Sequence, residues 1–205
     1  IHKTTRSILS VLLAVLLLVT STPLTPAFAE EVGSVSPQSE SAEGRALEQA
    51  QDGTYLIYTA ENLKEFAAIV NGTDSISADS DADARLMNNI DLNGSEEIHE
   101  PIGNSIDNPY EGTFNGDGHT ISGLYINSSD NDQGLFSYVS GSGKVKNLSD
   151  SGSVKGNDYV GGVVGYNNGG TVTGCIFSGS GSVSGGWYVG GVVGHNGFSA
   201  TVTNC

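Results

Sequence analysis

Two groups of residues in this sequence resemble parts of a metal site, and a third chemistry, polysaccharide cleavage, can be judged from the distribution of charged residues. The first is His99-Glu100, which begins like the zinc motif of a metallopeptidase helix. The second histidine of that motif is replaced by Gly103, and Pro101 would break the helix that carries it. The sequence therefore predicts no zinc-dependent peptidase activity from this pair.

The second group is a run of alternating carboxylates at Asp79, Asp81 and Asp83. An EF-hand loop that starts at Asp79 would need glycine at its sixth position and glutamate at its twelfth. Ala84 and Ile90 stand at those positions. We expect a solvated acidic loop here, and no metal or cofactor.

The third possibility is polysaccharide cleavage, which some parallel β-helix proteins perform. That chemistry needs clustered carboxylates, often with a basic residue, on one face. The basic residues of the C-terminal half are Lys144, Lys146 and Lys155, and no acid recurs beside them. The sequence therefore predicts a protein that is not an enzyme, with no catalytic residues.

The elements around these groups are arranged as a repeat. The segment 159–167, Tyr-Val-Gly-Gly-Val-Val-Gly-Tyr-Asn, returns 29 residues later as Tyr-Val-Gly-Gly-Val-Val-Gly-His-Asn at 188–196. A near-copy at a fixed spacing is typical of a repeat architecture. Val-rich runs bounded by Gly, Ser and Asn indicate short strands separated by turns.

A second pattern consists of apolar residues three positions apart with Gly or Asn just before the second one. Gly and Asn enter the left-handed backbone region most readily, so we expect one sharp bend per repeat. We also expect Ile121 to share an inward column with Val145, Val172 and Val202. The apolar pairs are Met87/Ile90, Ile121/Leu124, Val145/Leu148, Val172/Cys175 and Val202/Cys205, with Asn89, Gly123, Asn147, Gly174 and Asn204 at the bends.

The fold class that follows is all-β, a right-handed parallel β-solenoid of about five coils. A propeller is disfavoured because its repeat is longer, about 40 to 50 residues. One helix is expected in front of the coils, with Thr59 as its N-cap and Asn71-Gly72 at its end. We interpret it as a cap on the N-terminal end of the solenoid, and packing against a side wall is the alternative.

The chain also resembles a known family. The segment 160–167, followed by Gly169-Gly170-Thr171-Val172 and Cys175, is similar to the GLUG repeat of bacterial secreted and surface proteins. The segment 110–124 resembles the stretch that precedes such repeats. The resemblance implies an extracellular β-helix of the kind found in large surface proteins, including N-terminal regions of immunoglobulin A-cleaving metallopeptidases. It implies no activity for the repeat itself.

The N-terminus indicates secretion. Lys3 and Arg6 precede an apolar run of 12 residues, and Ala27-Phe28-Ala29 supplies a small-x-small cleavage pattern. The run is shorter than the roughly 20 residues of a membrane span. We predict a signal peptide at 1–29, a flexible acidic linker at 30–52 and a β-helix at 53–205 that continues beyond Cys205 in the native protein.

The excess of acidic residues restricts the classes of binding partner. Removing residues 1–29 leaves 23 acidic and 6 basic residues. Such a surface disfavours nucleic acid and anionic membranes. The expected location is extracellular, secreted or at the cell surface, with no membrane association after signal cleavage.

The candidate ligand-binding residues are three aromatics, Tyr159, Trp187 and Tyr188, which the repeat places near one another on the outside of the coils. Host or cell-wall glycan or protein is the expected partner. Lateral packing that only stabilises the strands is the alternative, and a structural stalk or the non-catalytic N-terminal region of a larger metallopeptidase are alternative functions. The spacing of Cys175 and Cys205 leaves both free thiols and a disulfide open.

Overall fold

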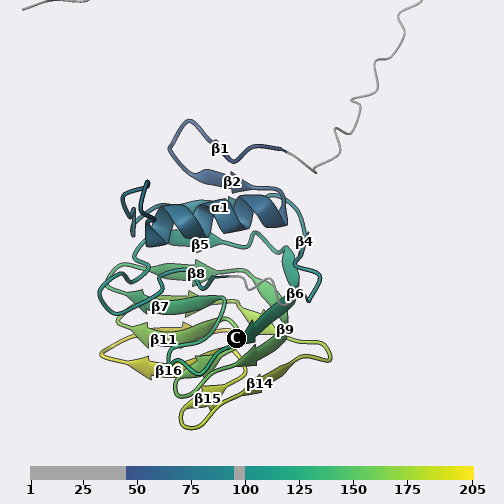
Figure 1. Ribbon diagram of the computed structural model, residues 1–205, viewed down its shortest axis with the longest axis vertical. Coiled ribbons are helices and arrows are strands. Elements are labelled where there is room, and N and C mark those ends of the chain that lie inside the picture. The colour runs from purple at the N-terminus through teal and green to yellow at the C-terminus, as the bar shows by residue number, and fades with distance from the viewer. Residues whose placement is uncertain (1–44, 95–99) are drawn as a thin grey trace, which may run out of the picture. The chain divides into compact units, whose positions relative to one another are not determined.

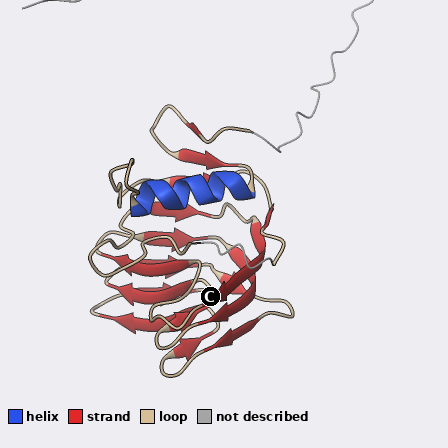
Figure 2. Ribbon diagram, viewed as in Figure 1, coloured by secondary structure: helices blue, strands red, loops and turns tan. Residues whose placement is uncertain are grey.

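The structure, a computed structural model, describes residues 45–94 and 100–205, which form a parallel β-solenoid (Figures 1 and 2). Each coil places short strands beside the equivalent strands of the preceding coil, so the sheets grow by parallel pairing. The predicted β-solenoid of about five coils, with one helix near its N-terminal end, is confirmed.

The longest sheet, called here the long sheet, has seven strands in the order β1-β2-β3-β5-β8-β12-β17. In its central strands an inward apolar residue is flanked by outward polar residues, as in Thr-Phe-Asn of β5 and Thr-Val-Thr of β12. Its strands are β1 Glu48–Gln49, β2 Tyr55–Ile57, β3 Ala84–Leu86, β5 Thr113–Asn115, β8 Lys144–Lys146, β12 Thr171–Thr173 and β17 Thr201–Thr203.

Two further sheets and a strand pair complete the coils. One sheet runs β13-β9-β6-β4, with β14 also paired to β9; another runs β16-β11-β7; and β10 pairs with β15. The strands are β4 Ile90–Asp91, β6 Thr120–Asn127, β9 Ser149–Lys155, β13 Ile176–Phe177, β14 Ser182–Ser184, β7 Phe136–Ser140, β11 Val164–Asn168, β16 Val193–Gly197, β10 Val160–Gly161 and β15 Val189–Gly190.

The inward column of the long sheet contains Val145, Val172 and Val202 in register, as predicted. The prediction that Ile121 heads this column is wrong, because Phe114 pairs with Val145. Ile121 lies one strand later, on β6, opposite Asp150 of β9. The reason is the length of the turn: residues 116–119 separate β5 from β6, whereas only 147 and 148 separate β8 from β9.

The predicted bends are left-handed at four of the five positions. Asn89 is the exception, since its φ is not positive. Its side-chain oxygen instead accepts a hydrogen bond from the backbone N–H of Thr120 at 2.9 Å, and the left-handed turn comes later, at Asn93 and Gly94. The confirmed bends are Gly123 (φ 71°), Asn147 (φ 53°), Gly174 (φ 61°) and Asn204 (φ 55°).

Substituting valine for Asn147 tests these bends. A β-branched residue is strained at φ 53°, so Asn147→Val should lower the free energy of unfolding by about 1 to 3 kcal/mol. Asn147→Gly removes the same side chain, which lies 3.2 Å from Asn115 Oδ1, but tolerates the conformation. Urea denaturation of both variants separates the two effects. Equal stability of the valine and glycine variants would contradict a left-handed bend.

The helix α1, Ala60–Asn71, begins and ends where the sequence predicts. Thr59 is its N-cap and accepts a hydrogen bond from the backbone N–H of Asn62 at 3.1 Å, and Gly72 follows its last residue. Its inner face is buried, and the Phe66 ring lies 6.0 Å from that of Phe114. The helix therefore caps the N-terminal end of the core (Figure 1).

Part of the predicted linker, residues 45–52, is described by the structure and contains β1. β1 pairs antiparallel with β2, Glu48 opposite Leu56, so the predicted boundary at residue 53 falls inside this hairpin. The predicted signal peptide, 1–29, and linker residues 30–44 lie outside the described residues, as does His99. Among the residues described, no helix combines the length and apolarity needed to cross a bilayer.

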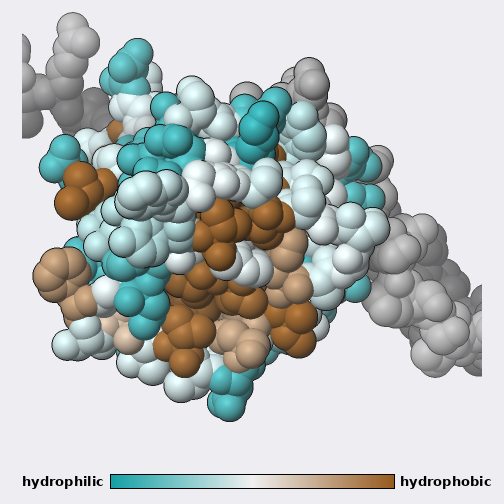
Figure 3. Space-filling view, turned by 90° about the horizontal axis from the view of Figure 1, so that it is seen from below, coloured by the Kyte–Doolittle hydropathy of each residue, from teal (hydrophilic) through white to brown (hydrophobic). Residues whose placement is uncertain are grey.

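The other end of the solenoid exposes apolar side chains. Viewed from below, these side chains gather in the middle of the face (Figure 3). The strands β15, β16 and β17 each lie at an edge of their sheet. The last described coil is therefore the most open part of the core, and its exposed residues include Ile176, Val189, Phe198 and Val202.

Candidate functional site

A cluster of aromatic rings, buried at Tyr138 and exposed at Tyr188, lies on the coils that contain β7, β11 and β16. These strands place Tyr138, Tyr166 and His195 at one register. The rings of Tyr138 and Tyr166 stack at 4.8 Å with 11° between their planes, and His195 lies 4.6 Å from Tyr166. Parallel pairing therefore turns one position of the repeat into a continuous aromatic column.

A second column stands beside the first. Tyr159 and Tyr188 directly precede β10 and β15, and their rings stack at 5.0 Å and 9°. Tyr159 lies 5.2 Å from Tyr166, and Tyr188 lies 5.1 Å from His195. We call the five side chains together the aromatic face: Tyr138, Tyr159, Tyr166, Tyr188 and His195.

The backbone of the second column is strained. Tyr159 and Tyr188 have φ values of 59° and 58°, in a left-handed region that bulky residues rarely enter. Asp132, one coil earlier, has φ 56° at the equivalent position. Such a conformation costs about 1 to 3 kcal/mol and persists only where neighbouring structure holds it, here by ladder bonds such as Tyr159 N–H to Trp187 O at 2.9 Å. Both tyrosine rings lie against His195, with centroids 5.4 Å and 5.1 Å away.

The accessible part of this face lies toward the last coil. Tyr138 is buried at 4% exposure, whereas Tyr188 is 52% exposed and Trp187 is 73% exposed. Trp187 makes no ring contact with another aromatic residue in the described part of the chain. A ligand that approached this face would meet Tyr188 and Trp187 first.

The carboxyl group of Asp132 lies one coil before Tyr159, at the N-terminal end of the second column. Burial raises the pKa of Asp132 to about 6, and its Oδ1 atom has no hydrogen-bond partner among the described residues. Burial and then neighbouring groups, Asp132 among them, raise the pKa of Tyr138 and Tyr166. The face can thus offer ring surfaces, phenolic hydroxyls and one carboxyl group whose pKa is raised to about 6.

The sequence-predicted residues are placed as follows. The structure brings Tyr159 and Tyr188 together, as the repeat indicated, and leaves Trp187 beside them and outside the stack. Sequence reasoning missed Tyr138, Tyr166 and His195. The 29-residue repeat contained a signal for two of them, because Tyr166 and His195 are equivalent positions in the two copies.

Two carboxylates of the acidic run, Asp79 and Asp83, are affected by the surrounding structure. Asp83 Oδ1 accepts a hydrogen bond from the backbone N–H of Thr113 at 2.6 Å, and burial raises the pKa of Asp79. No group of three or more His, Cys, Asp or Glu side chains in the described ranges could hold a metal ion.

The two cysteines are not bonded to each other. Cys175 is a buried free thiol and Cys205 an exposed one, and burial raises the Cys175 pKa to about 11.

Two comparisons with known proteins found similar sequences. The family model described as the GLUG motif matches residues 185–205, which contain Trp187, Tyr188 and His195. A halomucin from Haloquadratum walsbyi is 34% identical over 128 residues, a match that covers 60% of this chain and 1% of that protein. No solved structure matches the chain. The chain is therefore a parallel β-solenoid whose residues 185–205 match the GLUG motif and which is similar over part of its length to a halomucin.

Proposed function

We propose that this chain is a non-catalytic segment of a secreted or cell-surface protein, and that its aromatic face binds a glycan. The repeat-built solenoid with its GLUG motif fits an extracellular module, and the similarity to a halomucin supports a surface location. The formal net charge of −15 suits a domain that stays dispersed in solution.

The main support for glycan binding is the left-handed backbone of Tyr159 and Tyr188. Glycine would occupy a left-handed position without strain, yet two consecutive coils hold tyrosine there. Backbone strain concentrates at functional sites, where it helps to present a side chain in a fixed position. Flat rings with a polar edge can stack on the apolar face of a sugar while the hydroxyl group forms hydrogen bonds. Exposed Trp187 adds a further ring.

A stalk in which the rings only stabilise the coils is the second candidate. The stacking of Tyr159 on Tyr188 favours it, because ring pairs contribute about 0.5 to 1.5 kcal/mol beyond burial. A segment preceding the catalytic domain of a larger metallopeptidase would be non-catalytic in the same way. These functions differ in whether loss of an exposed ring changes binding or only stability.

A glycan-binding measurement separates them. Tyr188→Ala and Trp187→Ala should each weaken binding to the best glycan on an array by about tenfold, since exposed aromatic anchors dominate such contacts. Tyr125→Ala is the matched control, because Tyr125 lies on β6 and has no ring partner among the described residues. The bound glycan should be recovered intact if the chain is not an enzyme.

The outcomes against the proposal are specific. Tyr188→Ala with unchanged binding and a lowered melting temperature would support the stalk. Chain-dependent shortening of the glycan, or cleavage of a protein substrate that a chelator stops, would contradict the non-catalytic assignment.

A further inference from the structure

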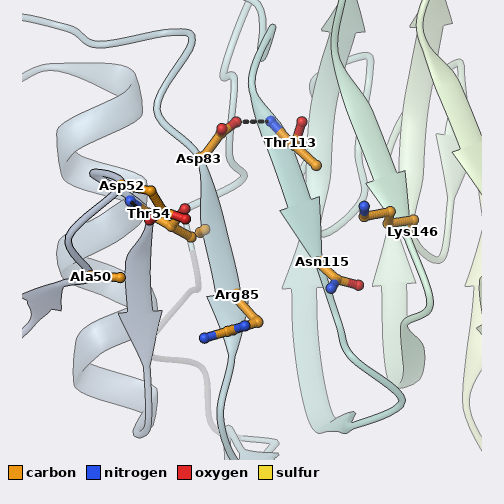
Figure 4. Close-up of a pocket in the computed structure, with 9 residues that line it drawn as sticks. Ala50, Asp52, Thr54, Asp83, Arg85, Thr113, Asn115 and Lys146 are labelled. Carbon is orange, nitrogen blue, oxygen red and sulfur yellow. Dashed lines mark hydrogen bonds between the residues drawn. The ribbon is translucent and has the colours of Figure 1, made fainter.

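A polar groove crosses the outer face of the long sheet, away from the strands that carry the aromatic face (Figure 4). Its volume is about 190 Å³. Arg85, Asn115 and Lys146 stand in one row on β3, β5 and β8, so the Cα atoms of Arg85 and Lys146 are roughly 10 Å apart. We call this the Arg85 groove, and its lining extends from Ala50 to Lys146 and includes Asp52, Asp83, Thr113 and Asn115.

Among the described residues, the two cations of the groove have no close ion-pair or hydrogen-bond partner, and Arg85 acts on the Asp52 carboxylate only at longer range. Neither Arg85 nor Lys146 forms an ion pair or side-chain hydrogen bond with any residue that the structure describes, and the Nε of Arg85 is buried without an acceptor. Buried donors are nearly always paired, because an unmade hydrogen bond is costly. The side chains of Arg85 and Lys146 therefore lack hydrogen-bond acceptors, and a ligand in the groove would supply them.

The carboxylates of the groove are already engaged. Asp83 accepts the bond from Thr113 N–H, and Asp52 Oδ1 accepts one from Thr54 N–H at 3.0 Å, a bond that lowers the Asp52 pKa. In Figure 4 the amine of Lys146 is directed over β5, and the guanidinium of Arg85 lies toward β2. The terminal guanidinium nitrogens of Arg85 and the Lys146 amine are therefore the donors left for a ligand, while the acids accept backbone N–H groups.

We propose that the Arg85 groove binds a single acidic sugar unit, with one carboxylate or sulfate group, carried on an otherwise neutral glycan. The planar guanidinium pairs with such an anion through two parallel hydrogen bonds. Asn115 and the ammonium of Lys146 then meet ring hydroxyls or the neighbouring sugar. This site is separate from the aromatic face and does not depend on the function proposed for it.

Charge and size restrict the ligand to one acidic unit. A polyanion would be repelled by a chain of net charge −15 and by the two carboxylates in the groove. The volume is below the roughly 300 to 1,000 Å³ of drug-sized sites, which suits a small part of a glycan. A second hollow, about 570 Å³, is lined by Glu100 and Asp130 with no cation, so an anion is not expected there.

The test is calorimetric titration of the full chain with sialyllactose, lactose 3′-sulfate and lactose at low salt. At least one acidic sugar should bind about tenfold more tightly than lactose, and the better one identifies the anion. Arg85→Gln should reduce that binding about tenfold and Lys146→Gln severalfold. Lys155→Gln removes the same charge on β9, in another sheet, and should leave the affinity unchanged.

Other results would overturn the proposal. Equal binding of lactose and the acidic sugars, no binding of either acidic sugar at millimolar concentration, or an equal loss with Lys155→Gln would each do so. Circular dichroism checks the fold of the Arg85 variant, and if it is unfolded, Lys146→Gln decides. Tyr188→Ala should not change this affinity, which keeps the result distinct from that of the aromatic face.

Discussion

Phe114→Ala should lower the free energy of unfolding by about 3 to 5 kcal/mol. Phe114 is fully buried on β5, and its ring lies 5.2 Å from that of Phe136 in an edge-on arrangement. It also contacts Phe66 of α1, with ring centroids 6.0 Å apart. Removing the ring leaves a cavity where the helical cap meets two sheets, and the lost apolar contacts and the cavity both count against the folded state.

Urea denaturation followed by circular dichroism measures this loss. Phe198→Ala is the matched control, because Phe198 is 80% exposed and its truncation should change stability by no more than about 0.5 kcal/mol. A loss below about 1 kcal/mol at Phe114 would mean that the cap and sheets do not share one core. A lower slope of the transition for the variant alone would indicate that the cap unfolds separately from the coils.

Asp150→Asn should change how stability depends on pH. Asp150 is fully buried on β9; its Oδ1 accepts the backbone N–H of Ser151 at 2.7 Å, and its Oδ2 has no partner among the described residues. Burial raises its pKa well above the ordinary range, and the Ser151 bond offsets this only in part. The folded protein therefore favours the protonated carboxyl.

The sign of the effect follows from that raised pKa. The stability that the protonated Asp150 contributes is fully present below the unfolded pKa, near 3.9, and is lost as pH rises through the folded pKa. In that window the free energy of unfolding should fall by about 1.4 kcal/mol for each pH unit. Asp132, whose pKa is raised to about 6, acts in the same direction and is present in both proteins.

The measurement is the difference in unfolding free energy between Asp150→Asn and the parent protein at several pH values from 4 to 8. The unpartnered amide costs the same at every pH, so the informative quantity is the slope of this difference, which should favour the variant as pH rises. Asp117→Asn, at an exposed aspartate, is the control substitution. A flat difference for Asp150→Asn would mean that the buried carboxyl is not protonated in the folded chain.

Much of the fold could be predicted from the sequence because equivalent coils repeat equivalent local rules. The 29-residue copy predicted the parallel register of Val160 with Val189 and the stacking of Tyr159 on Tyr188. Asn147 and Gly174 marked left-handed bends because few other residues tolerate them. Thr59 and Gly72 delimited the helix through capping.

Only the tertiary structure decided the register between coils with turns of unequal length and the grouping of residues from strands far apart in the sequence. The turn after β5 is two residues longer than the turn after β8. Phe114 therefore pairs with Val145 in the inward column, and Ile121 falls on the next strand, β6. Asp150 is buried because β9 pairs in that shifted register with β6. The Arg85 groove joins residues from Ala50 to Lys146, which only the stacking of coils brings together. Local sequence specifies bends and strand faces, whereas the register between unequal coils is set by packing of the whole core.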